Sequence, residues 1–199
     1  MCIRDRVIKE KDVLQHLDEL EASEFVVRVN KDNKLFYTFQ HPIFQEVAYN
    51  SLLKSERSIY HKLIAEKIET DFRDMEGYYT TLAHHYFNCR DIAKALDYSM
   101  KAGDEAAKLY ANEEALVNYY KALSFVTDQA AKILIMEKIG DVESFIGNVE
   151  RAMGIYREAN GVVKDNLTRA RLTAKIGRLL TNTEKVDEGI ELMRKAYNS

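Results

Sequence analysis

The sequence predicts an all-α protein made of antiparallel helix hairpins, preceded by a small module that contains one β-hairpin. From Ser55 onward the chain has no proline, and apolar residues recur at three- and four-residue steps, as they do on one face of a helix. Small residues also recur at fixed steps in this part of the chain, which is typical of stacked helical hairpins. Between Phe25 and Phe39, β-branched and aromatic runs flank turn-forming residues, which indicates a hairpin of strands.

Composition limits the class of protein. The 199 residues are 46% hydrophobic and 31% charged, which is typical of a folded globular chain, and a net charge of −3 favours no general binding to polyanions. Two cysteines cannot build a disulfide framework, so we expect a reducing, cytoplasmic location. No apolar run approaches the ~20 residues that span a bilayer, so no membrane partner is expected. Residues 1–6 (MCIRDR) resemble translated adapter sequence, and we interpret them as a leader foreign to the natural chain.

Residues 7–54 form the first predicted domain. Leucines and a valine at helical spacing predict a helix over about 9–22, and the runs at 25–29 and 35–39 predict strands joined by the turn residues 30–33. Pro42 suits the first turn of the next helix, where a missing N–H costs little. We expect that helix to bury its apolar face, which consists of Ile43, Phe44, Val47, Ala48 and Leu52.

Helix, hairpin and helix in this order resemble a winged-helix module, for which DNA binding is the obvious interpretation. The charge argues against DNA, because residues 9–24 contain six acids and two bases, and a helix in the major groove needs cations to offset phosphates. We therefore expect a packing module between domains, with no nucleic-acid partner.

Residues 55–75 are predicted to form a connecting helix. Apolar residues four apart predict a helix over about 56–72 whose buried face is Tyr60, Ile64, Ile68 and Phe72. The acids Asp71, Asp74 and Glu76 then mark a break, which we interpret as a solvated loop rather than a pair of general acid–base groups.

The third predicted domain, residues 76–199, contains an internal repeat. Its copies are aligned on a small residue that ends a pair, namely Ala83, Gly140 and Gly177. Twelve, sixteen and nineteen residues later come Ala95, Ser99 and Ala102 in the first copy, Ala152, Tyr156 and Ala159 in the second, and Gly189, Met193 and Ala196 in the third. Ala115, Tyr119 and Ala122 have the same internal steps and predict a shortened copy between the first two. Small residues let two helices approach closely, while the large residue fills the space between hairpins.

This pattern resembles the tetratricopeptide repeat, although its period here is 37 rather than the usual 34 residues, and only Tyr86 keeps the early aromatic of that motif. Glu143 and Leu180 take that place in the later copies. Short oxygen-bearing side chains precede the periodic segments and are predicted N-caps: Asp91, Asn112, Asn148 and Thr183.

Candidate chemistry is sparse. His84, His85 and Cys89 invite a metal interpretation, but a structural zinc site needs four ligands and no second pair has matching spacing. No glycine-rich phosphate-binding motif is present either. The chain itself is therefore predicted to be neither an enzyme nor the holder of a cofactor or metal.

A groove on the first helices of the hairpins is the predicted binding surface for a protein or peptide partner. The side chains expected to line it are His84, Phe87, Asn88, Glu137, Asp141, Ser144, Arg171, Arg178 and Asn182. Along this row the charge changes from acidic to basic, and the row lacks the lysine and asparagine pairs with which chaperone-binding repeats hold a C-terminal carboxylate.

One stretch extends the resemblance. Residues 39–53 read F-x-H-x-x-x-Q-E-V-A-Y-x-S-L-L, and IYHKLIAEKIE and LAHHYFNCRDIAKALDYSMKAGDEAAKLYANEEALVNYYKAL follow. This succession, over about 11–125, resembles the region after the ATPase core in bacterial signalling ATPases of the STAND class, especially those linked to adenylate or guanylate cyclases. The resemblance implies an ATP- or ADP-binding core in cis, and it implies that His41 contacts nucleotide phosphates. A histidine at a helix N-terminus suits an anion, although a histidine held by a backbone carbonyl at a domain seam is the plainer alternative.

The sequence thus predicts the regulatory, partner-binding part of a multidomain signalling ATPase, with no catalysis of its own. Two alternatives stay open: part of a DNA-binding transcription regulator of the same ATPase group, and a free-standing repeat scaffold.

Overall fold

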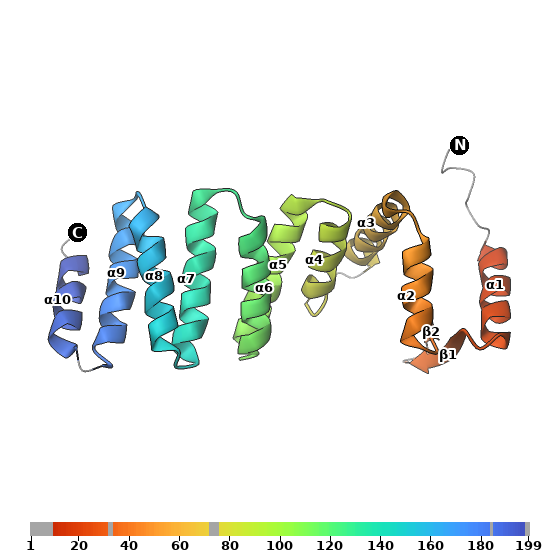
Figure 1. Cartoon of the computed structure of the whole chain (residues 1–199), viewed down its shortest axis with the longest axis horizontal. Helices are drawn as coiled ribbons and strands as arrows, with labels where there is room; N and C mark the ends of the chain where they lie inside the picture. The colour runs from red at the N-terminus through yellow and green to blue at the C-terminus, as the bar shows by residue number, and fades with distance from the viewer. Residues whose placement is uncertain (1–9, 32–33, 72–75, 184, 198–199) are drawn as a thin grey trace. The chain divides into compact units, whose positions relative to one another are not determined.

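The computed structural model describes residues 10–31, 34–71, 76–183 and 185–197. These residues are mainly helical with one small two-stranded antiparallel sheet, which confirms the predicted all-α class (Figure 1). The chain divides into two compact units, Met1–Arg57 and Ser58–Ser199. Some predicted features lie outside the described residues, namely the leader at 1–6, the centre of the hairpin turn, Phe72 and Asp74.

Unit 1 contains the predicted helix, hairpin and helix. These are α1 (Glu10–Ala22), β1 (Val26–Lys31), β2 (Lys34–Phe39) and α2 (Pro42–Ser51). The strands pair antiparallel, with Val26 opposite Phe39. Arg28 of β1 bonds the carboxylates of Asp18 and Glu21, so acids of α1 are neutralised within the unit.

The predicted burial of the α2 apolar face is wrong. Ile43 and Val47 are 57% and 60% exposed, and no residue of α2 is buried. Phe44 packs edge-on against Phe25 with ring centroids 4.8 Å apart. Among the described residues of unit 1, Val26 is the only buried hydrophobic side chain. Helical periodicity identifies the apolar side of α2, but the described part of unit 1 leaves Ile43 and Val47 uncovered.

The predicted connecting helix is α3 (Lys54–Asp71), which begins in unit 1 and continues into unit 2. Its buried face was also predicted wrongly, because Tyr60 and Ile64 are about half exposed, whereas His61 and Ala65 are buried. The small Ala65 packs with Leu82 in the first apolar cluster of unit 2, so close approach rather than side-chain size decides which face of α3 is covered.

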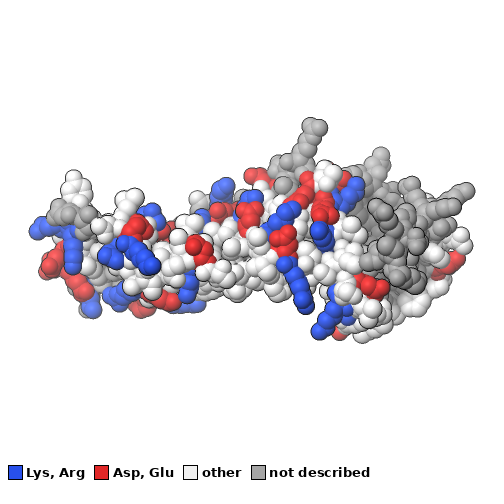
Figure 2. Space-filling model, turned by 90° about the horizontal axis from the view of Figure 1, so that it is seen from above, with Lys and Arg blue, Asp and Glu red and all other residues white. Residues whose placement is uncertain are grey.

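Unit 2 continues as a row of antiparallel helices (Figure 1). They are α4 (Tyr79–Asn88), α5 (Ile92–Lys108), α6 (Asn112–Phe125), α7 (Gln129–Phe145), α8 (Val149–Val162), α9 (Asn166–Leu180) and α10 (Val186–Tyr197). The closest neighbours are α5 with both α4 and α6, α7 with α8, and α9 with α10. Positive and negative side chains intermingle over the face of these helices that Figure 2 shows.

Three glycines 37 residues apart set the hairpin spacing. A Cβ atom on Gly103 of α5 would lie 2.5 Å from the Tyr119 ring of α6, and one on Gly140 of α7 would lie 2.4 Å from the Tyr156 ring of α8. In the third hairpin, a Cβ atom on Gly177 would lie 2.8 Å from the Met193 side chain. Each first helix therefore needs a glycine where the large residue of the second helix packs.

This geometry corrects the predicted shortened copy, which is complete. Its first helix is α5, and Gly103 is the counterpart of Gly140. The same helix also packs on α4, with Ala95 in one cluster with Ala83. Helix α5 therefore serves two neighbours, and the 37-residue hairpins are α5–α6, α7–α8 and α9–α10.

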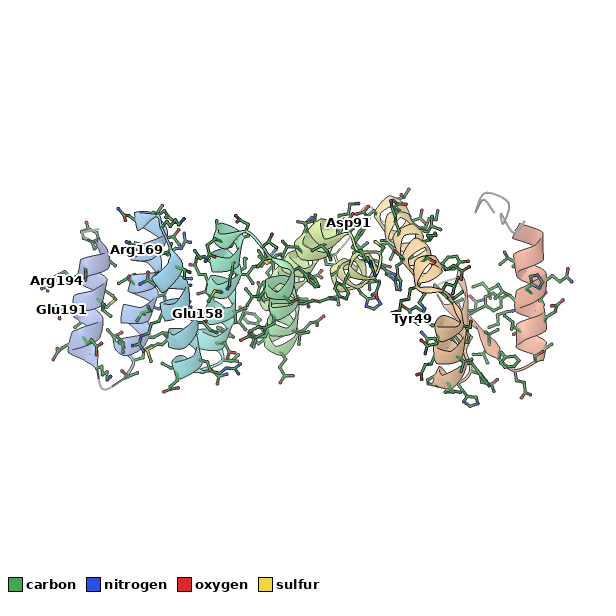
Figure 3. All side chains as sticks on the ribbon, turned by 45° about the horizontal axis from the view of Figure 1, so that its top comes forward. Tyr49, Asp91, Glu158, Arg169, Glu191 and Arg194 are labelled. Carbon is green, nitrogen blue, oxygen red and sulfur yellow. The ribbon has the colours of Figure 1, made fainter. Side chains whose placement is uncertain are left out.

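The first helices share one N-cap. The carboxylates of Asp91, Asp128 and Asp165, again 37 residues apart, accept hydrogen bonds from the N–H groups three residues later, at 3.1, 2.8 and 2.7 Å. Figure 3 shows Asp91 at the start of α5. The predicted cap at Asp91 is confirmed and that at Asn112, which lies inside α6, is wrong. Asn148 precedes α8, but its side chain makes no capping hydrogen bond, and its amide donates to Glu143.

Candidate partner-binding face

The predicted groove residues fall into two groups. His84, Phe87 and Asn88 lie on α4, whereas the others lie on α7, on α9 or in the turn after α9. The structure brings members of the second group together, because Glu137 of α7 meets Arg171 of α9. The acids of α7 thus pair with the bases of α9 instead of forming separate zones.

Glu137 is enclosed by cations. Arg171 donates to its two oxygens at 2.8 and 2.7 Å, Lys175 lies 2.8 Å away, and the Glu137 side chain is only 7% exposed. Burial alone would raise the pKa of Glu137, but the hydrogen bonds from Arg171 and Lys175 outweigh it and lower that pKa. Glu137 is therefore ionised at neutral pH, and a partner reaches it only by displacing these cations.

A second arrangement occurs twice and is called the Tyr–Asp–Lys set. In the first set, Asp104 accepts from the Tyr119 hydroxyl at 2.6 Å and from Lys138 at 2.6 Å. The second set, 37 residues on, consists of Asp141, Tyr156 and Lys175, with bonds of 2.6 and 2.5 Å. Burial, and then the bond to aspartate, raise the pKa of both tyrosines, so their hydroxyls stay protonated donors.

Each Tyr–Asp–Lys set joins two hairpins. The tyrosine and aspartate belong to one hairpin, and the lysine comes from the first helix of the next. Sequence reasoning found Asp141 but missed Asp104, Lys138 and Lys175. The signal was present, because Lys101, Lys138 and Lys175 follow one another at the same 37-residue step as the glycines.

A shallow depression of about 260 Å³ adjoins the first set through Asp104. Its lining residues are Glu76, Tyr79, Lys101, Asp104, Glu105, Lys108 and Leu109. Both charge signs occur here, so this surface favours a partner with paired charges over a purely anionic or cationic one.

The α4 residues lie in a different environment. The Asn88 amide donates to the His84 carbonyl at 2.8 Å, and Phe87 stacks on Phe125 with centroids 5.0 Å apart. The Nδ1 atoms of His61 and His85 are 2.8 Å apart, so one donates to the other. Burial lowers the pKa of His85 to about 4 and lowers that of His61, so both rings are neutral at pH 7.

Of the residues that invite a metal interpretation, His84 and His85 lie together, with ring centroids 5.5 Å apart. Cys89 donates its thiol hydrogen to the Tyr86 carbonyl at 3.3 Å. Across residues 10–31, 34–71, 76–183 and 185–197, no group of three or more His, Cys, Asp or Glu side chains could hold a metal ion.

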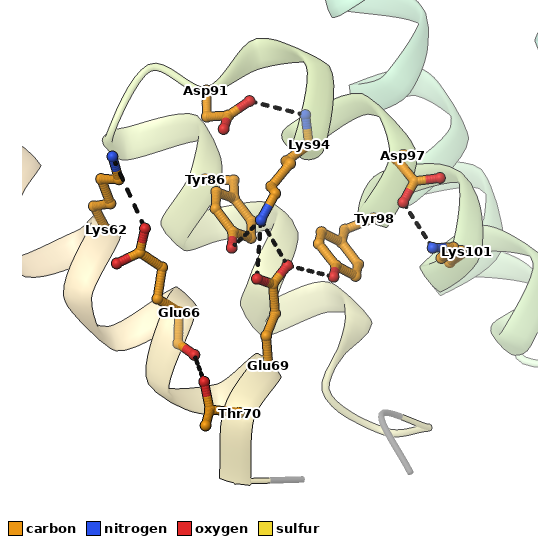
Figure 4. Close-up of polar contacts among 10 residues, drawn as sticks. All are labelled: Lys62, Glu66, Glu69, Thr70, Tyr86, Asp91, Lys94, Asp97, Tyr98 and Lys101. Carbon is orange, nitrogen blue, oxygen red and sulfur yellow. Dashed lines mark hydrogen bonds and ion pairs between the residues drawn. The ribbon is translucent and has the colours of Figure 1, made fainter. Parts of the chain in front are cut away.

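A partly buried polar network holds α3 against α4 and α5 (Figure 4). The Lys94 ammonium donates to both oxygens of Glu69, at 3.0 and 2.9 Å, and to the Tyr86 hydroxyl at 2.8 Å. The Tyr98 hydroxyl donates to Glu69 at 2.6 Å. Burial would raise the pKa of Glu69, but these donors outweigh it and lower that pKa, so the ion pair persists at neutral pH. The network gives the repeats a defined polar contact with α3.

His41 occupies the N-cap position of α2, directly before Pro42. Its backbone is extended, with φ −129° and ψ 139°, and its side chain makes no capping hydrogen bond. The ring is exposed and lies edge-on to Phe44, with centroids 5.7 Å apart. The imidazole therefore stands at the N-terminus of a helix, where an anion is favoured.

No family model matches the chain. Over 155 residues it is 26% identical to an uncharacterized protein of Rhizobium meliloti (strain 1021), an alignment that covers 71% of this chain and 15% of the relative. The chain thus spans a small part of the length of the curated relative that it matches. None of the described helices is both long and apolar enough to cross a membrane.

Proposed function

We propose that this chain is the regulatory, protein-binding part of a larger cytoplasmic signalling ATPase, associated with a nucleotide cyclase. In this proposal unit 1 is a winged-helix module and the hairpins of unit 2 are tetratricopeptide repeats. The observation that carries the proposal is the polar face on α5, α7 and α9, on which ion pairs join each hairpin to the next. Extended faces of stacked repeats are a common form of protein-binding surface.

The ion pairs suggest how binding is transmitted. Asp104–Lys138, Asp141–Lys175 and Glu137–Arg171 each join residues 34 apart, from one first helix to the next. A partner that competes for these charges alters the contact between neighbouring hairpins. The Lys94–Glu69 pair then offers a path from the repeats to α3, which leads to unit 1.

The exposed apolar face of α2 supports the second half of the proposal. A helix on which Ile43 and Val47 are more than half exposed is unusual for a surface that stays in contact with solvent. The exposed apolar side chains favour burial of this helix against another domain. We assign that role to an ATPase core. The small share of the Rhizobium meliloti relative that the chain spans supports a parent protein with several domains.

His41 provides the test of nucleotide sensing. In the full-length parent, His41→Ala is expected to lower the ADP that remains bound after purification, measured by chromatography of the released nucleotide. His16→Ala is the matched control, because this exposed histidine on α1 pairs with Glu19, and it should leave the ADP content unchanged. Equal ADP content in the wild-type protein and both variants would contradict the role of His41.

The gene upstream of residue 7 tests the parent itself. A phosphate-binding loop and a cyclase domain in the same reading frame are the expected result. A helix-turn-helix domain would instead favour the transcription regulator, and a start codon close to Val7 would favour the free-standing scaffold.

A further inference from the structure

One flank of α10 carries exposed apolar side chains in a row. Val186, Ile190 and Tyr197 are 44%, 45% and 92% exposed. At 100° per residue these positions share one side of the helix. Met193 borders this row, and Met193 together with Gly189 packs on α9, so the exposed row adjoins the packed side of the helix. Figure 3 shows the charged Glu191 and Arg194 on the side of α10 away from α9.

The internal repeat shows what this row does elsewhere. Subtracting 37 from Val186 and Ile190 gives Val149 and Met153 of α8. These two side chains are partly buried against the cluster that contains Leu172 of α9. The third position of the row on α8 is the polar Asn160, whose amide donates to Thr173 of α9 at 3.4 Å, so the row on α8 meets the first helix of the next hairpin.

The same holds one hairpin earlier. Another 37 residues back, Leu116 and Leu123 of α6 are the counterparts of Ile190 and Tyr197. Both are partly buried against the cluster that contains Ile135 and Ile139 of α7. Asn112 takes the place of Val186 on α6, so on α6 and α8 the apolar part of this row packs in a cluster that it shares with the following first helix.

The covering helices have a common pattern. Helix α7 offers Ile135, Ile139 and Val142, and α9 offers Leu172, Ile176 and Leu179 at the positions 37 residues later. Each set consists of large buried aliphatic residues at steps of four and three.

Charge adds a second requirement. The aspartates 104 and 141 each accept a lysine from the following first helix. The equivalent position on α9 is Arg178, which is exposed. A lysine from a further helix would therefore meet a like charge, whereas an acid would pair with Arg178.

We propose that the face of α10 formed by Val186, Ile190 and Tyr197 receives the first helix of a further hairpin, supplied by the same polypeptide beyond residue 199 of the longer protein. That helix carries three aliphatic residues at the spacing of Leu172, Ile176 and Leu179, and an acid at the position equivalent to Lys175. The inference rests on the internal repeat and on the small share of its relative that the chain spans, and it does not depend on the proposed signalling role.

The test extends the full chain by its own repeat. Residues 163–199 are appended directly after Ser199, which continues the 37-residue register, and Lys175→Glu is made in the appended copy only. Amide hydrogen exchange of residues 186–197 is then compared with that of the unextended chain. We expect exchange to slow by about tenfold or more, because a covered helix opens less often.

Three matched variants complete the test. An extension that keeps lysine should give about two- to fivefold less protection than the glutamate version, the range for one exposed ion pair. Val186→Glu with Ile190→Glu in the original α10 should abolish the gain, whereas Glu191→Gln with Arg194→Gln should retain it. Unchanged exchange on extension, or equal protection with the two glutamates, would overturn the proposal. So would protection of α10 in the unextended chain by a concentration-dependent dimer, since the occupant would then be a second copy.

Discussion

Replacing Gly140 with alanine is the sharpest test of the hairpin geometry. A Cβ atom at this position would lie 2.4 Å from Cε1 of Tyr156, far inside van der Waals contact. The Tyr156 ring has little room to move, because it is 2% exposed and its hydroxyl is bonded to Asp141. We therefore expect α7 and α8 to be forced apart.

The magnitude follows from two opposing effects. Overpacking a well-filled core costs about 1–3 kcal/mol. Alanine in place of glycine within a helix returns about 1 kcal/mol. Because the Tyr156 ring is buried and its hydroxyl is bonded to Asp141, the overpacking cost should lie in the upper part of the range of about 1–3 kcal/mol. The free energy of unfolding should therefore fall by about 1–2 kcal/mol. With a urea m-value of about 2 kcal/mol/M, the unfolding midpoint should fall by about 0.5–1 M.

Gly154→Ala is the matched control, because it is the same substitution on α8 with nothing within 4 Å of the new Cβ. It should raise stability by about 0.5–1 kcal/mol through helix propensity alone. The two variants should therefore differ in sign. If Gly140→Ala also stabilises the chain, the close contact between Gly140 and Tyr156 is refuted. If Tyr156→Leu does not reduce the cost of Gly140→Ala, the ring is not what the methyl group meets.

Three other predictions concern buried and strained groups. The pKa of His85 is about 4 in the folded state, below the unfolded value of about 6.5, so the unfolded chain binds the proton first and stability should fall by about 1–3 kcal/mol from pH 6.5 towards pH 4. His85→Gln should flatten this decline in urea midpoints measured from pH 8 to 5, and an unchanged decline would mean that His61 and His85 are not coupled as described. Glu143 is fully buried, so Glu143→Leu should leave the melting temperature unchanged or higher. Asn148→Ala removes a hydrogen-bond donor to Glu143 and should lower the free energy of unfolding by about 1–3 kcal/mol, and a larger loss for Glu143→Leu than for Asn148→Ala would contradict this account. Arg90 has a left-handed φ of 66°, so Arg90→Gly should raise the unfolding free energy by about 1 kcal/mol in a urea titration, and a loss would mean that its side chain makes a stabilising contact.

Local sequence patterns predicted the elements well because their causes are local. Helical spacing, the turn residues before Leu35 and the proline that begins α2 act within a few residues of the chain. The same patterns failed for burial on α2 and α3. A pattern shows which side of a helix is apolar, but burial depends on what other elements lie opposite, and that information is not local.

The repeat was misaligned at its first copy for a related reason. Helix α5 packs on two neighbours, so it carries Ala95 for its contact with α4 and Gly103 for its contact with α6. Because α5 has to fit both α4 and α6, its sequence matches two alignments of the repeat. The alignment on Ala83 follows the contact with α4 and therefore misses the 37-residue spacing of the hairpins. The recurring aspartates 91, 128 and 165 would have revealed it.

The charge pairs of the candidate face could not be predicted from the sequence without the 37-residue spacing of the hairpins. Their partners are 34 residues apart, which is three less than the period. Lys138 therefore lies one turn before Asp141 of its own helix and bonds Asp104 of the preceding hairpin.

The third hairpin departs from this arrangement in two places at once, which argues that the parts of the Tyr–Asp–Lys set depend on one another. Where the first two hairpins have aspartate, α9 has Arg178, and where they have a buried tyrosine, α10 has Met193. A tyrosine hydroxyl buried there would lose the carboxylate that satisfies it in the other hairpins, and an unsatisfied buried hydroxyl is costly. Methionine fills the space beside Gly177 without that requirement. The loss of the acceptor thus accounts for the loss of the donor, and the same change leaves Arg178 as the cation that an acid on a further helix would meet.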